Sequence, residues 1–300
     1  LNSDIKLIRL PKFKSSNSPF ESAIKIKLLP NSKASQTTIF IILAILIAGA
    51  ITGGVYFINE NKKAVSREFF SSSDVQPVLK NIQTKILDCS EETSKKSLEK
   101  IGVQGGYYNK PKYYFDMKSN FIPYYYYEGQ ILMPSKSTIE NELSSYVNKN
   151  LEKCLETNYQ NFEITFKKPK TKTTIREKEV NFLINLPIKI EKDNYDVTFE
   201  LKEHPVAISS ELDAILGVAN FITETHREDP AMYCVSCVGQ LAEEDDLYVD
   251  ILKFRNNEML VIISENHTAS EPYSFEFLNK YTGKEASPLT ILNETAPKPG

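Results

Sequence analysis

Two cysteines three residues apart form the sharpest chemical motif in the sequence. Cys234-Val-Ser-Cys237 places two thiols within reach of each other. A redox site would need a thiolate stabilised at the start of a helix, and a zinc site would need two further ligands. The other two cysteines and the three histidines could supply those ligands. The motif favours a structural disulfide, with a redox pair and a metal site as alternatives.

The other two cysteines each end an amphipathic helical pattern. Apolar residues recur every three or four positions from Val75 up to Cys89, and again from Ile139 up to Cys154. An even number of cysteines is typical of disulfide bonding in an oxidising compartment. We therefore expect the pairs Cys89–Cys154 and Cys234–Cys237, the first joining two packed helices near their ends.

Eight of the sixteen tyrosines lie between residues 104 and 128. Gly105-Gly106, Pro111 and Pro123 interrupt regular structure there, which predicts a long loop. Tyrosine combines an apolar ring with a polar hydroxyl and is enriched where proteins contact partners. The consecutive tyrosines are candidate partner contacts, or their rings fasten the loop to the domain. They are Tyr124, Tyr125, Tyr126 and Tyr127.

The sequence lacks the motifs of common catalytic sites. It contains no Gly-rich phosphate loop, no G-x-S-x-G and no H-E-x-x-H. We therefore expect a non-catalytic protein with no cofactor and no metal ion. Asn266-His-Thr268 and Asn293-Glu-Thr295 fit the N-glycosylation sequon, so Asn266 and Asn293 are candidate glycan sites on an exported chain.

An apolar segment near the N-terminus has the length of a membrane span. Residues 39–58 read IFIILAILIAGAITGGVYFI, and no charged residue lies between Lys33 and Glu60. A helix of this length covers about 30 Å, the thickness of the hydrocarbon core of a bilayer. A soluble helix would keep a polar face, which this segment lacks. The sequence therefore predicts a transmembrane helix within residues 36–60, with the lipid bilayer as its partner.

Charge is distributed unevenly around this segment. Residues 1–35 carry seven Lys or Arg against Asp4 and Glu21, although the whole chain has a net charge of −3. Positive residues favour the cytoplasmic side, and an acidic body argues against nucleic acid as a partner. The predicted organisation is a basic cytoplasmic tail or leader at 1–35, a transmembrane helix at 36–60, a helical stalk at 61–100 and an extracytoplasmic domain at 101–300.

Small residues recur along one face of the predicted transmembrane helix. Such a face lets two helices approach closely in lipid, which predicts self-association. The alternative is that Gly and Ala are simply common in membrane helices. The candidate helix–helix contacts are Ala44, Ala48, Gly49, Thr52 and Gly53.

The region beyond the membrane segment shows both helical and strand periodicity. Helices are predicted over 72–100, 136–157 and 208–227. Strict alternation of apolar residues over 180–190 predicts a half-buried strand, followed by a turn at Asp193-Asn194. Further strands are predicted at 161–168, 173–179, 197–201, 247–254, 258–264 and 273–280. Because helices and strands do not alternate regularly, the predicted class is α+β, with a mixed helix and antiparallel-sheet domain.

Lys33-Ala-Ser-Gln-Thr-Thr38, followed directly by the apolar run, resembles the N-terminal signal of archaeal type IV pilins. That resemblance implies cleavage near Ala34 or Ser35 and packing of the apolar helix in a filament core. The whole layout also resembles uncharacterised single-pass membrane proteins of small-genome archaea. The segments that carry this second resemblance are Ile101-Gly-Val-Gln-Gly-Gly106, Ile122–Glu128 and Glu271-Pro-Tyr273.

These observations predict a membrane-anchored protein of the cell surface. Its outer domain would make structural or adhesive contacts with other envelope proteins or with further copies of itself. A pilin-like filament subunit and an envelope thiol–disulfide protein that uses Cys234 and Cys237 are the alternatives.

Overall fold

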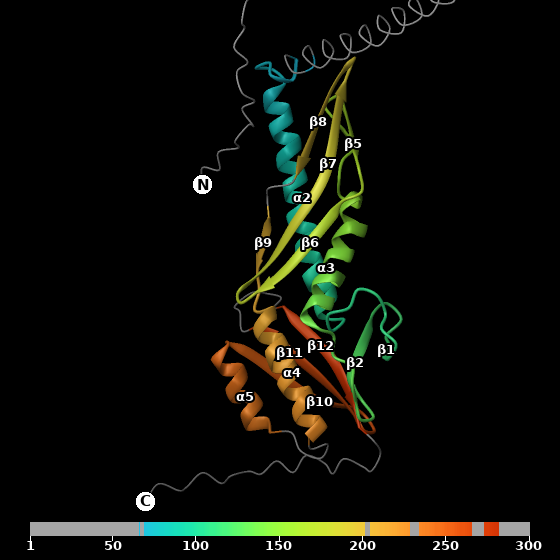
Figure 1. Ribbon diagram of the computed structural model, residues 1–300, viewed down its shortest axis with the longest axis vertical. Helices are drawn as coiled ribbons and strands as arrows, with labels where there is room; N and C mark the ends of the chain where they lie inside the picture. Colours follow the sequence, from blue (N-terminus) through green and yellow to red (C-terminus); the bar gives the residue numbers. More distant parts are fainter. Residues whose placement is uncertain (1–65, 67–68, 202–204, 229–233, 266–272, 282–300) are drawn as a thin grey trace, which may run out of the picture. The chain divides into compact units, whose positions relative to one another are not determined.

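The computed structural model describes Ser66 and residues 69–201, 205–228, 234–265 and 273–281 (Figure 1). The chain divides into two units, Leu1–Phe57 and Ile58–Gly300, and every described residue belongs to the second. None of the helices in the described ranges is long and apolar enough to cross a bilayer. The predicted tail, the predicted transmembrane helix with its small-residue face, and both sequons lie outside the described residues.

The first sheet is organised around one long strand, β7 (Glu179–Lys192). Its first half pairs with β6 (Lys170–Arg176) and β9 (Val206–Ser209), and its second half pairs with β5 (Phe162–Phe166) and β8 (Tyr195–Leu201). The short β4 (Asn158–Tyr159) extends the edge beyond β5. All these pairings are antiparallel. The alternation predicted over 180–190 is confirmed, because every second side chain of β7 is buried.

Two helices pack along this sheet and contact each other (Figure 1). They are α2 (Gln76–Gly102) and α3 (Lys136–Asn150), and a turn of 3₁₀ helix, η1 (Leu151–Lys153), follows α3. Ser135 caps α3, since its hydroxyl accepts a hydrogen bond from the Thr138 amide at 3.2 Å.

Helix α2 is part of the domain, which corrects the prediction of a separate stalk over 61–100. Its apolar face, including Ile82, Ile86 and Leu98, belongs to the same buried core as Phe182 in β7 and Phe277 in the second sheet. The face is buried because its apolar positions recur with helical spacing and meet both sheets. A domain boundary at residue 101 would cut through this core.

The second sheet joins the tyrosine-rich segment to the C-terminal strands. Its order is β1 (Tyr114–Asp116), β2 (Phe121–Tyr127), β12 (Ser274–Lys280), β11 (Glu258–Glu265) and β10 (Leu247–Arg255), and β3 (Gln130–Ile131) also pairs with β2. The pairing of β12 with β2 is parallel, whereas the others are antiparallel. This sheet is therefore mixed, which corrects the prediction of purely antiparallel sheets, whereas the α+β class is confirmed.

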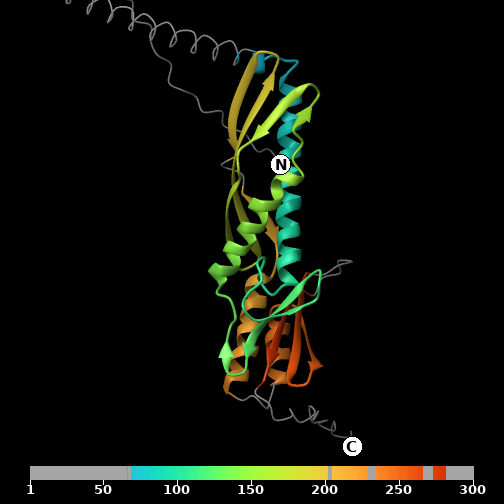
Figure 2. The ribbon, with the colours of Figure 1, turned by 90° about the vertical axis from the view of Figure 1, so that its right-hand side faces the viewer.

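Helices α4 (Leu212–Glu228) and α5 (Val235–Glu244) accompany the second sheet. α4 packs against β11 and α5 against β10, and the two helices contact each other. In the turned view of Figure 2, α2 runs along the first sheet until its C-terminal end meets the second. The predicted helix at 208–227 begins later than expected, because residues 206–209 pair with β7 as β9.

The segments Ile101–Gly106 and Ile122–Glu128 meet where α2 ends. The Tyr125 hydroxyl of β2 donates a hydrogen bond to the Gly105 carbonyl at 2.9 Å. A Cβ on Gly105 would lie 2.5 Å from Pro123 Cγ and 2.6 Å from the Glu276 carbonyl oxygen, and Gly105 has a φ of +52°. Only glycine fits this position, because it combines left-handed backbone with close contact to two strands. These segments therefore join α2 to the second sheet.

Candidate functional site

The Cys234–Cys237 disulfide lies at the N-terminus of helix α5. The two Cα atoms lie 5.2 Å apart, and Cys234 is the N-cap residue, whose sulfur accepts a hydrogen bond from the Cys237 amide at 3.3 Å. The helix was not predicted from the sequence. Its signal is the spacing of Val238 and Ala242, which are the buried residues of α5 and lie one turn apart.

The disulfide at this helix start is open to solvent. Cys237 is exposed, and Val235 between the two cysteines has 60% of its surface exposed. The first turn of α5 carries no acidic residue, whereas Glu243 and Glu244 lie at its far end. Free amide groups and the helix dipole make a helix start favourable for negative charge. A thiolate formed at Cys234 would therefore be stabilised by the helix itself.

The two disulfides differ in what they can contribute to stability. Cys89–Cys154 closes a loop with a sequence separation of 65, and Cys234–Cys237 one with a separation of 3. In the chain-entropy account the long loop is worth about 4 kcal/mol and the short one about 2 kcal/mol. Structural stabilisation thus explains Cys89–Cys154 well and leaves the short disulfide partly unexplained.

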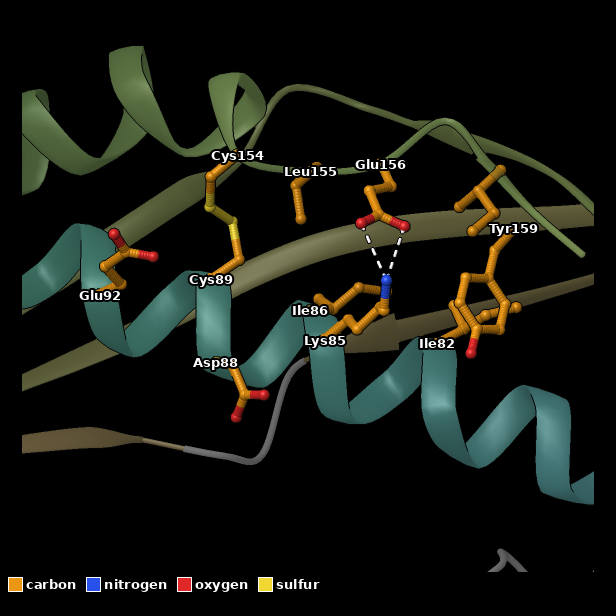
Figure 3. A pocket seen from close by; sticks show the side chains of 11 residues that line it. Ile82, Lys85, Ile86, Asp88, Cys89, Glu92, Cys154, Leu155, Glu156 and Tyr159 are labelled. Carbon is orange, nitrogen blue, oxygen red and sulfur yellow. Dashed lines mark hydrogen bonds and ion pairs between the residues drawn. A yellow bond between two sulfur atoms is a disulfide. The ribbon is translucent and has the colours of Figure 1, made fainter.

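A groove runs beside the Cys89–Cys154 disulfide (Figure 3). It has a volume of about 190 Å³ and lies between α2 and the segment that follows α3. Its apolar lining comes from three separate parts of the chain, which sequence reasoning did not bring together. The apolar and sulfur-bearing residues are Ile82, Ile86, Cys89, Cys154, Leu155, Tyr159 and Ile164.

The rim of this groove is acidic. Asp88, Glu92 and Glu156 line it together with one base, Lys85. Lys85 Nζ lies 2.8 Å from Glu156 Oε1, and this hydrogen bond is the main cause that raises the pKa of Lys85. Figure 3 shows the pair connecting α2 to the segment after Cys154. Glu92 also forms an ion pair, with Lys96 at 2.5 Å, so two of the three carboxylates in this lining are paired with lysines.

A second hollow of about 440 Å³ lies next to the first. The two share Leu155 and Ile164, and the second adds the exposed carboxylates of Glu152 and Glu163. We call the two together the acidic groove. Carboxylates around apolar side chains fit a ligand with positive charges on an apolar body.

Three of the four consecutive tyrosines are buried, which corrects the prediction of partner contacts for Tyr124, Tyr125 and Tyr126. They form strand β2 instead of a loop, and Tyr124, Tyr125 and Tyr126 are 7%, 0% and 4% exposed. Tyr125 stacks on Phe277 with ring centroids 4.3 Å apart, and burial raises its pKa well above the ordinary value. The alternative that these rings hold the segment to the domain agrees with this burial.

Tyr127 is the half-exposed member of the run. Lys280 Nζ lies 3.1 Å from its hydroxyl and 2.8 Å from Glu128 Oε1. These hydrogen bonds, to Glu128 first and then to Tyr127, raise the pKa of Lys280. Tyr127 is therefore held at the surface by β12.

Within the part of the chain that the structure describes, no three His, Cys, Asp or Glu side chains lie together as metal ligands. All four cysteines are paired, as expected from the sequence, in the disulfides Cys89–Cys154 and Cys234–Cys237. The side chains of His204, His226 and His267, named as possible zinc ligands, lie outside the described residues.

Comparisons of this chain with protein-family models, with curated proteins and with solved structures found no match.

Proposed function

We propose that this chain is an exported, membrane-anchored protein of the cell surface that binds other envelope components through the unit Ile58–Gly300. The observation that carries the proposal is the pairing of all four cysteines in two disulfides. Disulfides persist in oxidising compartments, whereas cytosolic thiols are kept reduced. The apolar segment at residues 39–58 supplies the anchor.

The acidic groove is the contact site in this proposal. Its partner is a polypeptide segment that carries Lys or Arg beside apolar side chains. Asp88, Glu152 and Glu163 supply negative charge, and the half-buried Leu155 and Tyr159 supply apolar surface. Complementary charge would steer the partner, while this apolar surface would supply affinity.

Thiol labelling of intact cells tests the export of the chain. A membrane-impermeant maleimide should label the cysteines only after reduction, and the protein should remain with membranes after washing at high salt. Labelling without reduction, or recovery of the intact chain in the soluble fraction without detergent, would contradict the proposal. N-terminal mass and electron microscopy of the same preparation separate an uncut anchor from a filament subunit trimmed near Ser35.

Peptide binding tests the groove. A fluorescent cationic amphipathic peptide should bind the purified chain, and binding should weaken as salt rises. The double variant Asp88→Asn/Glu152→Gln should weaken binding at least fivefold. Glu177→Gln, which changes an exposed carboxylate on the turn between β6 and β7, is the matched control and should leave binding unchanged. Equal loss in both variants would show non-specific attraction and remove the groove from the proposal.

A further inference from the structure

The Cys234–Cys237 disulfide combines features that a structural crosslink does not require. It lies at the exposed start of α5, and Val235 between the two cysteines is exposed. The Cys234 sulfur accepts a hydrogen bond from the Cys237 amide. A polypeptide thiol can therefore reach the bond without the domain opening. The closed loop is also too short for its stabilising effect to explain it fully.

We propose that Cys234 and Cys237 exchange their disulfide with pairs of thiols on other polypeptides. A thiolate of the substrate attacks the Cys237 sulfur and forms a mixed disulfide, and the Cys234 sulfur leaves as a thiolate. A second substrate thiolate attacks the substrate sulfur of that mixed disulfide, and Cys237 leaves. The substrate loses two electrons and two protons and gains a disulfide, while the cysteine pair of this chain gains them and becomes a dithiol.

The geometry assigns different roles to the two sulfurs. Cys237 is the exposed member of the pair, so it is the sulfur that an incoming thiolate meets first. The Cys234 sulfur accepts a hydrogen bond from the Cys237 amide nitrogen, 3.3 Å away. Cys234 is also the N-cap residue of α5, a position where negative charge is stabilised. A stabilised thiolate is the better leaving group in exchange.

The other disulfide of the domain provides an internal comparison. Cys154 is exposed in the acidic groove, but its partner Cys89 is 6% exposed. Attack on Cys154 would release a thiolate at Cys89 among apolar side chains, where a charge is costly. The proposal therefore assigns exchange to Cys234–Cys237 and a structural role to Cys89–Cys154.

Single-turnover oxidation of a synthetic peptide with two reduced cysteines tests the proposal on the oxidised full-length chain in detergent. The unchanged chain and the Cys89→Ser/Cys154→Ser variant should each form about one peptide disulfide per chain. Cys234→Ser/Cys237→Ser should form at least tenfold less. Circular dichroism checks that each variant is folded. No oxidation by the unchanged chain, or equal oxidation by Cys234→Ser/Cys237→Ser, would overturn the proposal.

Alkylation of the reduced chain with iodoacetamide tests the roles of the two sulfurs. At mildly acidic pH, mass spectrometry should find Cys234 labelled at least tenfold faster than Cys237, because the folded helix stabilises the Cys234 thiolate. In urea the two rates should become equal. Equal rates in the folded chain, or faster labelling of Cys237, would overturn the assignment. Neither experiment depends on where the chain resides, so their outcome is separate from that of the proposed export.

Discussion

Cys89 on α2 is bonded to Cys154, directly after η1, and their Cα atoms lie 5.9 Å apart. One helical turn earlier, Lys85 on the same helix forms an ion pair with Glu156. The covalent bond and the ion pair connect the same two segments. The bond resists thermal opening, whereas the exposed ion pair is screened by salt.

Removal of the long-loop disulfide should destabilise the domain more than removal of the short one. Cys89→Ser/Cys154→Ser should lower the free energy of unfolding by about 4 kcal/mol and the melting temperature by roughly 10 °C. Cys234→Ser/Cys237→Ser should cost about half as much free energy. Differential scanning calorimetry of the two variants measures both effects. A larger loss for the short loop would contradict the entropic explanation.

Gly105→Ala should be among the most destabilising single changes at a glycine. The added Cβ would meet Pro123 and the Glu276 carbonyl while the backbone has a positive φ, so we expect a loss of about 3 kcal/mol. Gly129→Ala is the matched control, because Gly129 also has a positive φ but a Cβ there would meet nothing within 4 Å. It should lose about 1 kcal/mol. Urea unfolding compares the two, and equal losses would show that backbone conformation alone matters.

Strands in which apolar and polar residues alternate were predictable from the sequence, whereas β2 was not. One face of β7 is buried, so its apolar residues recur with period two. In β2 six consecutive residues are buried, which removes that period, and Pro123 inside the strand argued for a loop. The strand forms because Tyr125 faces the core while Tyr124 packs with Ile122 and Leu278 in a second cluster.

The Cys89–Cys154 disulfide and the acidic groove also differ in whether they could be predicted from the sequence. Two helical patterns that end in cysteines are visible along the chain, so the Cys89–Cys154 pair could be predicted. The acidic groove could not be, because α2 supplies Ile82, the segment after α3 supplies Leu155, and β5 supplies Ile164. Their contact depends on the packing of α2 against both sheets.

Alkaline pH should destabilise the domain through Tyr124. Its pKa is raised to about 12, first by burial and then by the charge of Glu258 and a hydrogen bond to it. The folded state therefore holds the proton more tightly than the unfolded chain, whose tyrosines titrate near pH 10. The stabilisation is complete below about pH 10 and is lost as pH rises toward 12. Melting temperatures across this range should fall less steeply in Tyr124→Phe, and identical slopes would contradict the assignment.

Glu265 at the end of β11 caps the start of α4 from a different element. Glu265 is 5% exposed, and its Oε1 accepts hydrogen bonds from the Glu211 amide at 2.7 Å and from the Ser210 hydroxyl at 3.0 Å. The Ser210 hydroxyl in turn accepts a hydrogen bond from the Leu212 amide at 3.2 Å, so the carboxylate holds the residues that begin the helix. Glu265→Ala should therefore cost about 2 kcal/mol of stability.

Glu265→Gln is the matched control for this cap. Glutamine keeps one carbonyl oxygen that can accept the Glu211 amide, so its cost should be about 1 kcal/mol. Hydrogen exchange gives a local measurement, because the Glu211 and Leu212 amides should exchange faster in Glu265→Ala than in Glu265→Gln. Unchanged exchange in Glu265→Ala, with the global stability also unchanged, would show that water replaces the carboxylate at no cost. In that case α4 would be held by its apolar face, through Leu212, Ile215 and Ile222 in the core, and not by its cap.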